Sequence, residues 1–358
     1  MTVALDATPL TVPTGGVGRY TWELARALAE TFPQDRYWLL SDQAFAPPEA
    51  LPSNLRVGAG PANAAERRWW LWGLPRELDR RGAEVFHGTD FSVPYRGPRP
   101  SVMTVHDLSP WMDFGADSGA SARVRRRTPR LLRWGLAQRV ITPSETVRRA
   151  VIEKFALSPD RVVATPLAAA EWFRPVKAGV PERYFLFVGT LEPRKNVTRL
   201  IEAWRATRDR TQAELWLAGR VRPDFAAPAG EPGLRLLGAV PDGALPGLYC
   251  GALAVVYPSL YEGFGLPVLE AMQCGAVVIA SHDPAIEEVT GGAAAIHGAA
   301  AIHVNAADVR ELAEAFAILC VNPEKLAGLR ERALARASQF SWRRTAERTR
   351  EVYRAACS

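Results

Sequence analysis

Short apolar runs alternate with longer amphipathic stretches along the 358 residues of this chain. In the first half, the apolar runs predict strands at 3–5, 37–40, 85–86, 102–105 and 140–141. Apolar residues at helical spacing predict helices at 20–30, 66–80, 123–138 and 145–155, the last of them capped by the hydroxyl of Ser144. This alternation is typical of a parallel sheet with helices on both faces.

The alternation restarts after 171–181, where two prolines and a glycine predict a linker. Further strands are predicted at 184–188, 215–218, 234–237, 254–257 and 277–280, and helices near 197–207, 267–273 and 307–319. A polar helix is predicted at 341–356. The sequence therefore predicts an α/β protein with an N-terminal domain at 1–172, a C-terminal domain of nearly equal size at 182–340, and a C-terminal helix at 341–358.

The composition excludes several classes of protein. Apolar residues make up 48% and charged residues 23%, which is typical of globular proteins and not of disordered ones. No apolar run approaches the roughly 18 residues of a membrane span, and residues 1–7 do not have the pattern of a signal peptide. The four cysteines form no C-x-x-C pair, which argues against a disulfide framework or a zinc site and favours the cytoplasm.

The excess positive charge lies in the first half of the chain. Residues 1–177 hold 24 basic and 18 acidic residues, a net charge of +6, whereas the remainder is neutral. This asymmetry indicates an anionic partner, although a general bias towards arginine explains it equally well. Two patches with this composition suit an anionic membrane surface. The first patch consists of Arg67, Arg68, Trp69, Trp70 and Trp72. The second consists of Arg123, Arg125, Arg126 and Arg127. The spacing of Trp69 and Trp72 instead favours packing of both on the core.

The strongest chemical pattern is SLYEGFGLPVLE at 259–270. A strand runs into a loop with Gly263 and Gly265, and Pro267 stands where a helix begins. Backbone amides at a helix N-terminus bind phosphate well, and Glu270, one turn into the helix, can accept hydrogen bonds from sugar or ribose hydroxyls. The alternative is that Glu262 and Glu270 are solvated glutamates beside a structural turn.

Two further loops follow predicted strands. In GTLEPRKN at 189–196, Arg194 and Lys195 stand at the carboxyl end of a strand, where open α/β sheets bind ligands, and can hold a phosphate. TGGVGRY at 14–20 nearly matches a dinucleotide fingerprint, but Thr21 replaces its third glycine.

Histidine offers one candidate at a strand end. His106, in VMTVHD, can bind a substrate hydroxyl or carry a proton. His282, His297 and His303 do not have the spacing of metal ligands, so no metal site is predicted. There is no G-x-S-x-G motif and no Walker A loop, which excludes two common classes of hydrolase.

Taken in order, TGGVGRY, HD, GTLEPRKN and EGFGLPVLEAM closely resemble the retaining glycosyltransferases of family 4, which have the GT-B fold. The resemblance extends from Val3 to the final helix and is closest to bacterial enzymes of cell-surface polysaccharide synthesis, including mannosyltransferases. Its most specific element is the pair Glu262 and Glu270. HGTDF at 87–91 and TPSE at 142–145 are weaker similarities.

The resemblance implies two doubly wound, Rossmann-like domains that face each other across a cleft. The second would hold a nucleotide-sugar donor and the first a glycan or lipid-linked acceptor, with the terminal helix packed on the first. It implies a cytoplasmic protein at the inner face of the membrane, with no cofactor and no nucleic-acid partner. GDP-mannose is the first choice of donor and a UDP-sugar the second.

The resemblance also assigns roles to individual residues. Arg194 and Lys195 would neutralise the donor diphosphate, and Glu262 would contact the donor sugar as a binding and electrostatic group. Backbone amides would hold the sugar and its phosphate, and these belong to Gly263, Phe264, Gly265 and Leu266. Glu270 would bind the ribose hydroxyls of the donor, and the backbone at Gly16 would approach its diphosphate. His106 would line the transferred sugar, and Val240 would contact the base.

The chain departs from the family pattern in two places. Thr190 stands where many relatives have an arginine, so Arg194 is expected to supply that charge, and Leu167–Ala169 replace an asparagine-glycine turn. The implied mechanism is transfer with retention, without a metal, in which the leaving phosphate takes the acceptor's proton. Three alternatives are a sugar-nucleotide epimerase or hydrolase, a dinucleotide-dependent oxidoreductase and a non-catalytic carbohydrate-binding protein.

Overall fold

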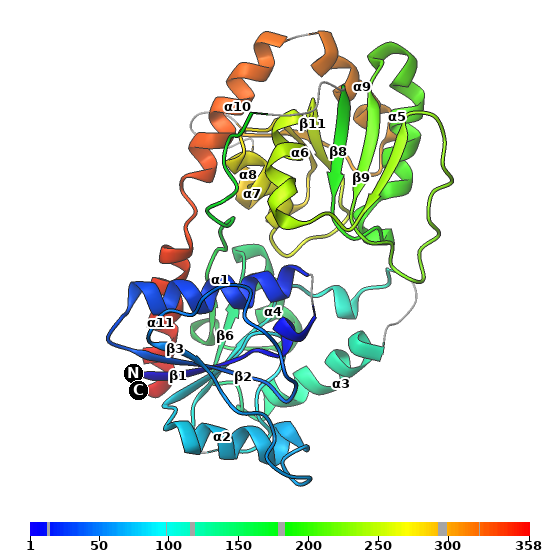
Figure 1. The fold of residues 1–358 in the computed structure, drawn as a ribbon. Helices are drawn as coiled ribbons and strands as arrows, with labels where there is room; N and C mark the ends of the chain where they lie inside the picture. The colour runs from blue at the N-terminus through cyan, green and yellow to red at the C-terminus, as the bar shows by residue number, and fades with distance from the viewer. Residues whose placement is uncertain (13–14, 98, 115–118, 178–182, 293–298, 322) are drawn as a thin grey trace. The chain divides into compact units, whose positions relative to one another are not determined.

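The structure is a computed structural model that describes all residues except 13–14, 98, 115–118, 178–182, 293–298 and 322 (Figure 1). Thr14, the end of the predicted linker and His297 therefore lie outside the described residues. The chain divides into two compact units. The N-terminal unit comprises Met1–Met112, Asp117–Leu167 and Ser341–Ser358, and the C-terminal unit comprises Asp113–Ala116 and Ala168–Phe340.

The N-terminal unit is built on a seven-stranded parallel sheet with the order β3-β2-β1-β4-β5-β6-β7. Its strands are β1 (Thr2–Asp6), β2 (Arg36–Leu40), β3 (Leu55–Val57), β4 (Val85–Gly88), β5 (Ser101–Thr104), β6 (Arg139–Thr142) and β7 (Val162–Ala164). The five strands predicted for this half are confirmed within about two residues, whereas β3 and β7, of three residues each, were missed because runs so short carry no periodicity.

The helices of this unit are α1 (Gly16–Thr31), α2 (Leu74–Arg81), α3 (Gly119–Arg133), α4 (Glu145–Phe155) and α11 (Trp342–Cys357). Ser144 caps α4 as predicted, because its hydroxyl accepts a hydrogen bond from the Val147 amide at 3.2 Å. The helical stretch predicted at 66–80 is present at 69–81, where a π-helical turn, Trp69–Gly73, runs without a break into α2. Residues 66–68 lie before it in a turn, and Pro75 is in the first turn of α2, where its missing N–H is tolerated.

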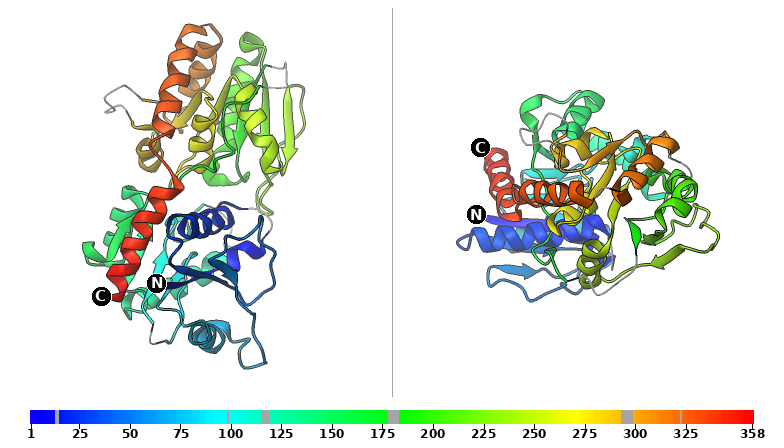
Figure 2. Two further views of the ribbon diagram at one scale, coloured as in Figure 1. Left: turned by 60° about the vertical axis from the view of Figure 1, so that its left-hand side comes forward. Right: turned by 90° about the horizontal axis from the view of Figure 1, so that it is seen from above.

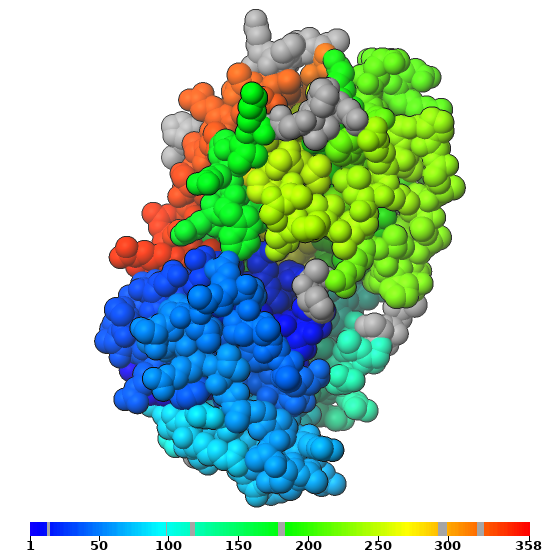
Figure 3. All heavy atoms as spheres, viewed as in Figure 1, coloured from blue at the N-terminus to red at the C-terminus, as the bar shows by residue number. Residues whose placement is uncertain are grey.

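The last helix packs within the N-terminal unit, where Figure 2 shows α11 alongside α1. Its apolar residues Trp342, Val352 and Tyr353 are buried. The Tyr353 hydroxyl lies 2.7 Å from His87 Nδ1, and Arg350 forms a 2.6 Å ion pair with Asp35. The connection between β2 and β3 runs over the surface of this unit, largely exposed (Figure 3).

The C-terminal unit has a six-stranded parallel sheet with the order β10-β9-β8-β11-β12-β13. Its strands are β8 (Tyr184–Val188), β9 (Glu214–Ala218), β10 (Leu234–Gly238), β11 (Ala254–Tyr257), β12 (Val278–Ser281) and β13 (Ile302–Val304). Its helices are α5 (Val197–Thr211), α6 (Leu245–Gly251), α7 (Leu266–Gln273), α8 (Pro284–Thr290), α9 (Val309–Val321) and α10 (Pro323–Ala337). In Figure 1, α5 and α9 cover one face of this sheet and α6 and α7 the other. The predicted doubly wound α/β class is confirmed.

The strand order fixes where a ligand can bind. In the C-terminal unit the order reverses between β8 and β11, which are hydrogen-bonded neighbours. At such a switch point the connections leave in opposite directions and open a crevice beyond the carboxyl ends of the strands. The loops at 189–196 and 258–265 follow β8 and β11, so both begin at this crevice. None of the helices in the described part of the chain combines the length and apolar composition needed to cross a membrane.

Candidate functional site

The loops after β8 and β11 are tied together by direct hydrogen bonds. The Leu260 amide donates to the carbonyl of Arg194 at 2.8 Å, and the Asn196 side-chain amide donates to the carbonyl of Pro258 at 3.2 Å. Asn196 precedes α5 with a φ of 59°, a conformation that asparagine tolerates better than most residues. The two loops therefore present their side chains as one unit.

The buried side chains of Lys195 and Glu262 form a charge cluster with the partly exposed Arg194 where these loops meet. Lys195 Nζ pairs with Glu262 Oε1 and donates to the Tyr257 hydroxyl at 2.5 Å. Arg194 Nη1 lies 3.2 Å from the second oxygen, Glu262 Oε2. Lys195 is 6% exposed and Glu262 5% exposed, so water screens this cluster little.

The charge states follow from this geometry. Burial by itself raises the pKa of Glu262, but the charges of Lys195 and Arg194 outweigh it and hold the pKa at about 2. Burial lowers the pKa of Lys195, and the Glu262 carboxylate opposes that shift. The pKa of Tyr257 is raised well above its usual value, first by burial and then by the Glu262 charge. At neutral pH, Glu262 is thus an ionised anchor for two cations and has no proton to donate.

Sequence analysis missed three residues that hold the cluster in place. Tyr257 contacts Lys195, and Glu192 bridges Arg194 at 2.7 Å and Arg222 at 3.1 Å. Asp283 Oδ2 accepts a hydrogen bond from the Glu262 amide at 3.1 Å, while Oδ1 caps α8 by accepting from the Ala285 amide at 2.9 Å. Aspartate before proline does signal a helix start. The other partner of Asp283, the amide of Glu262, is 21 residues away and could not be predicted from spacing.

The amides at 263–266 lie at the N-terminus of α7, which begins at Leu266. Gly265 has a φ of 92°, a left-handed conformation that favours glycine, and this bends the chain into the helix. The first amides of a helix have no partner within it and carry the positive end of its dipole. This end of α7 follows directly on Glu262, so it lies next to the charge cluster and can bind an anion.

Glu270 and Val240 occupy other parts of the C-terminal unit. Glu270 lies in α7, is 1% exposed, and accepts a hydrogen bond from the Tyr249 hydroxyl at 2.9 Å. Val240 follows β10, at the edge of the sheet and two strands away from β8. Contacts therefore join Arg194, Lys195 and Glu262, and Glu270 follows Glu262 through the loop and the first turn of α7.

The remaining predicted site residues, His106 and Gly16, belong to the N-terminal unit. His106 Nε2 donates to the Thr89 carbonyl at 2.7 Å, which leaves a lone pair on Nδ1 of the neutral ring, and Tyr20 packs edge-on against the ring at 4.9 Å. Gly16 opens α1, and a Cβ there would meet no heavy atom within 4 Å. Packing of the described residues therefore does not require a glycine at this position.

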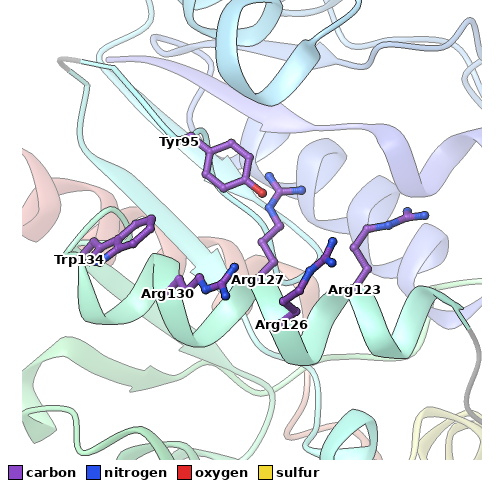
Figure 4. Close-up of a pocket in the computed structure, with 6 residues that line it drawn as sticks. All are labelled: Tyr95, Arg123, Arg126, Arg127, Arg130 and Trp134. Atoms are coloured by element: carbon purple, nitrogen blue, oxygen red, sulfur yellow. The ribbon is translucent and has the colours of Figure 1, made fainter.

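The N-terminal unit also has an arginine-rich pocket on α3 (Figure 4). Its lining residues are Tyr95, Arg123, Arg126, Arg127, Arg130 and Trp134. The Arg127 guanidinium lies 4.3 Å from the ring of Trp70 and 4.6 Å from that of Tyr95. Within the described part of the chain, none of these four arginines forms an ion pair with a carboxylate.

One expectation about the basic patches needs correction. Arg125, which belongs to the same predicted patch, does not line the α3 pocket, and its side chain donates to the carbonyl of Pro110 at 2.9 Å. Trp69 is buried as expected from core packing, but Trp72 is 39% exposed and lies under the guanidinium of Arg96 at 5.5 Å. The π-helical turn at Trp69–Gly73 changes the angle between the two side chains, so spacing in an α-helix does not apply.

Comparison with known proteins gives matches over both halves of the chain. Residues 14–168 match the family model described as Glycosyltransferase Family 4, and residues 182–322 match Glycosyl transferases group 1. The O-antigen chain mannosyltransferase B of Escherichia coli is 29% identical, over 99% of this chain and 100% of that protein. An MMP alpha-(1->4)-mannosyltransferase of Mycolicibacterium hassiacum is 31% identical, over 65% of this chain and 56% of its own length.

Solved structures show the same architecture at low sequence identity. A sucrose-phosphate synthase from Thermosynechococcus elongatus superimposes with a TM-score of 0.71 at 20% identity, over 99% of this chain and 98% of that one. The HepE protein of Anabaena, in complex with UDP-glucose, gives a TM-score of 0.73 at 16% identity, over 99% of this chain and 100% of that one.

Proposed function

Because this chain belongs to the group 1 glycosyltransferases of family 4 and has the GT-B fold, we propose that it is a retaining, metal-independent mannosyltransferase. It moves mannose from a nucleoside diphosphate sugar to a glycan or lipid-linked acceptor in cell-surface polysaccharide synthesis. The observation that carries this proposal is the charge cluster of Lys195, Arg194 and Glu262 beside the N-terminus of α7, at the switch point of the sheet.

The donor follows from the charge of this site and from the relatives. Two cations and the amides of a helix N-terminus suit the two phosphates of a nucleoside diphosphate. Two of the matched relatives are mannosyltransferases, which favours GDP-mannose, and the UDP-glucose bound by HepE makes a UDP-sugar the second choice. In this proposal Glu270 binds the ribose hydroxyls and Val240 the base.

The chemical step needs the developing charge of the leaving diphosphate to be stabilised. Lys195 and Arg194 are already held in position by Glu262, so they supply this charge without reorganising during the reaction. Because Glu262 is ionised and paired, it serves as an electrostatic and sugar-binding group, while the leaving phosphate accepts the acceptor's proton. From the N-terminal unit, the proposal assigns Nδ1 of His106 to a hydroxyl of the transferred sugar and the backbone at Gly16 to the diphosphate.

The test is release of nucleotide from GDP-mannose and UDP-glucose, with and without a mannan-type acceptor, in the presence of excess EDTA. We expect acceptor-dependent release of GDP that EDTA does not diminish, and a product with the α configuration of the donor. Loss of activity in EDTA would contradict the metal-independent step. Release without any acceptor would favour a hydrolase, and release from UDP-glucose alone would exclude GDP-mannose.

The α3 pocket supports contact of the N-terminal unit with the membrane that carries a lipid-linked acceptor. The four arginines of this pocket have no carboxylate partner among the described residues, so they can attract anionic headgroups, and Trp134, which is 59% exposed, suits the interface between headgroups and acyl chains. We expect the protein to cosediment with phosphatidylglycerol vesicles and not with phosphatidylcholine vesicles. Replacing Arg126 and Arg130 by serine should weaken cosedimentation severalfold, and unchanged binding by that variant would contradict the assignment.

A further inference from the structure

Two histidines and a glutamate meet beside the last two strands of the C-terminal sheet. His282 follows β12, Glu287 lies in α8 and His303 lies in β13. One ligand atom from each side chain lies within 4.8 Å of the other two. The spacing of the histidines along the chain predicted no metal site. The parallel pairing of β12 with β13, however, places Ala280 opposite His303. His282, two residues after Ala280, therefore has its ring 5.3 Å from that of His303.

Hydrogen bonds fix the orientation of His303. Its Nδ1 lies 3.1 Å from the carbonyl of Ser281, which only accepts, so Nδ1 carries the proton and Nε2 keeps its lone pair. The Thr290 hydroxyl, 2.9 Å from Nε2, also has the carbonyl of Ile286 within 3.1 Å. A metal ion therefore reaches Nε2 only once the Thr290 side chain rotates and its hydroxyl oxygen leaves this position. An imidazole whose second nitrogen donates to a carbonyl is the usual arrangement of a metal-binding histidine.

The other two side chains already lie in contact with each other. His282 Nδ1 is 2.7 Å from Glu287 Oε1, and both side chains are accessible, at 55% and 38% exposure. Ligand atoms around a tetrahedral Zn²⁺, with bonds of about 2.0–2.1 Å, are roughly 3.3–3.5 Å apart. The His282–Glu287 distance of 2.7 Å must therefore lengthen, and the distances to His303, at most 4.8 Å, must shorten by up to roughly 1.5 Å, through rotation of the two accessible side chains.

We propose that His282, Glu287 and His303 form a binding site for a divalent transition-metal ion of the Zn²⁺ class, with water in the fourth position. Two imidazoles and one carboxylate suit Zn²⁺, Co²⁺ or Ni²⁺, whereas Mg²⁺ and Ca²⁺ prefer oxygen ligands. The site does not rest on the proposed transfer reaction.

A metal at this position would stabilise the start of α8. It would join β12, α8 and β13, and His282 is followed directly by Asp283, which caps α8 and accepts the hydrogen bond from the Glu262 amide. The ion would thus hold in place the turn that positions the backbone of Glu262. It would add stability there without taking part in the charge cluster.

The experiment uses full-length protein without a histidine tag, stripped of metal with EDTA and dialysed. Zn²⁺ is titrated by calorimetry, Co²⁺ by its d–d absorption, and thermal melts are recorded with and without Zn²⁺. The variants are Glu287→Gln and His303→Gln, and the matched control is Glu288→Gln, the neighbouring glutamate of the same helix. Circular dichroism checks that each variant folds. If His303→Gln does not fold, the test still stands on Glu287→Gln, which is isosteric and alters an accessible side chain.

We expect one Zn²⁺ per chain, a tetrahedral Co²⁺ spectrum and a melting temperature several degrees higher with Zn²⁺. Glu287→Gln should lower the affinity at least about tenfold, since even groups that only support metal ligands contribute 10–100-fold. Glu288→Gln should bind as the wild type does. Equal Zn²⁺ affinity in Glu287→Gln and the wild type, or no stoichiometric binding by the wild type, would overturn the proposal.

Discussion

Replacing Lys195 by methionine should lower kcat/KM for the donor by about 10²–10³-fold, that is ~2.7–4 kcal/mol of transition-state stabilisation, the typical effect of removing one preorganised donor. Lys195 Nζ is buried and fixed by Glu262 and Tyr257, so its charge is preorganised before the donor binds. The measurement is steady-state release of GDP from GDP-mannose in the presence of acceptor.

The same substitution should lower the free energy of unfolding by about 3–5 kcal/mol, because it leaves the buried Glu262 carboxylate without one of its two cations. The double variant Lys195→Met/Glu262→Gln removes both charges and is the matched control. It should recover most of the stability and none of the activity. Wild-type kcat/KM in the single variant, or recovery of activity in the double variant, would contradict the assigned role of Lys195.

Replacing Glu270 by alanine should also lower kcat/KM by about 10²-fold or more, chiefly through weaker binding of the donor. The carboxylate is 1% exposed and held by the Tyr249 hydroxyl, so its position is fixed before a nucleotide binds. Calorimetric titration with GDP measures the effect directly.

Two comparisons separate ribose binding from a structural role of Glu270. Tyr249→Phe removes the supporting hydrogen bond to this carboxylate and should cost about 1.5–3 kcal/mol of stability, with a much smaller loss of activity. Wild-type protein should bind 2′,3′-dideoxy-GDP far more weakly than GDP, and Glu270→Ala should bind the two equally. A variant that still distinguishes the two nucleotides would refute the assignment to ribose.

Periodicity along the chain predicted most of the fold because buried parallel strands are short, nearly uninterrupted apolar runs. Tyr184–Val188 and Ala254–Tyr257 lie where the pattern placed them. Periodicity failed for the three-residue strands β3, β7 and β13, because three residues are too few to distinguish alternation from chance. At 66–80 it predicted the helical stretch but not its π-helical first turn, Trp69–Gly73, which changes the directions of the side chains.

The candidate site could be predicted only as far as single loops. Placement after a strand identified Arg194, Lys195 and Glu262, since the carboxyl ends of parallel strands meet at one edge of the sheet. That Glu262 pairs with both cations depends on β8 and β11 being neighbours, which is a property of the sheet topology. The contact of Asp283 with Glu262 and that of His282 with His303 also depend on the sheet topology. The first joins segments that follow β11 and β12, and the second joins the segment after β12 to β13.

The central claim is that the loops after β8 and β11 together bind a diphosphate. A crystal structure of the protein with GDP tests it most directly. Phosphate oxygens should lie within hydrogen-bond distance of Lys195 Nζ, the Arg194 guanidinium and the backbone amides at 264–266. Clear density for the diphosphate away from these groups, with Lys195 still paired only to Glu262 and Tyr257, would contradict the account.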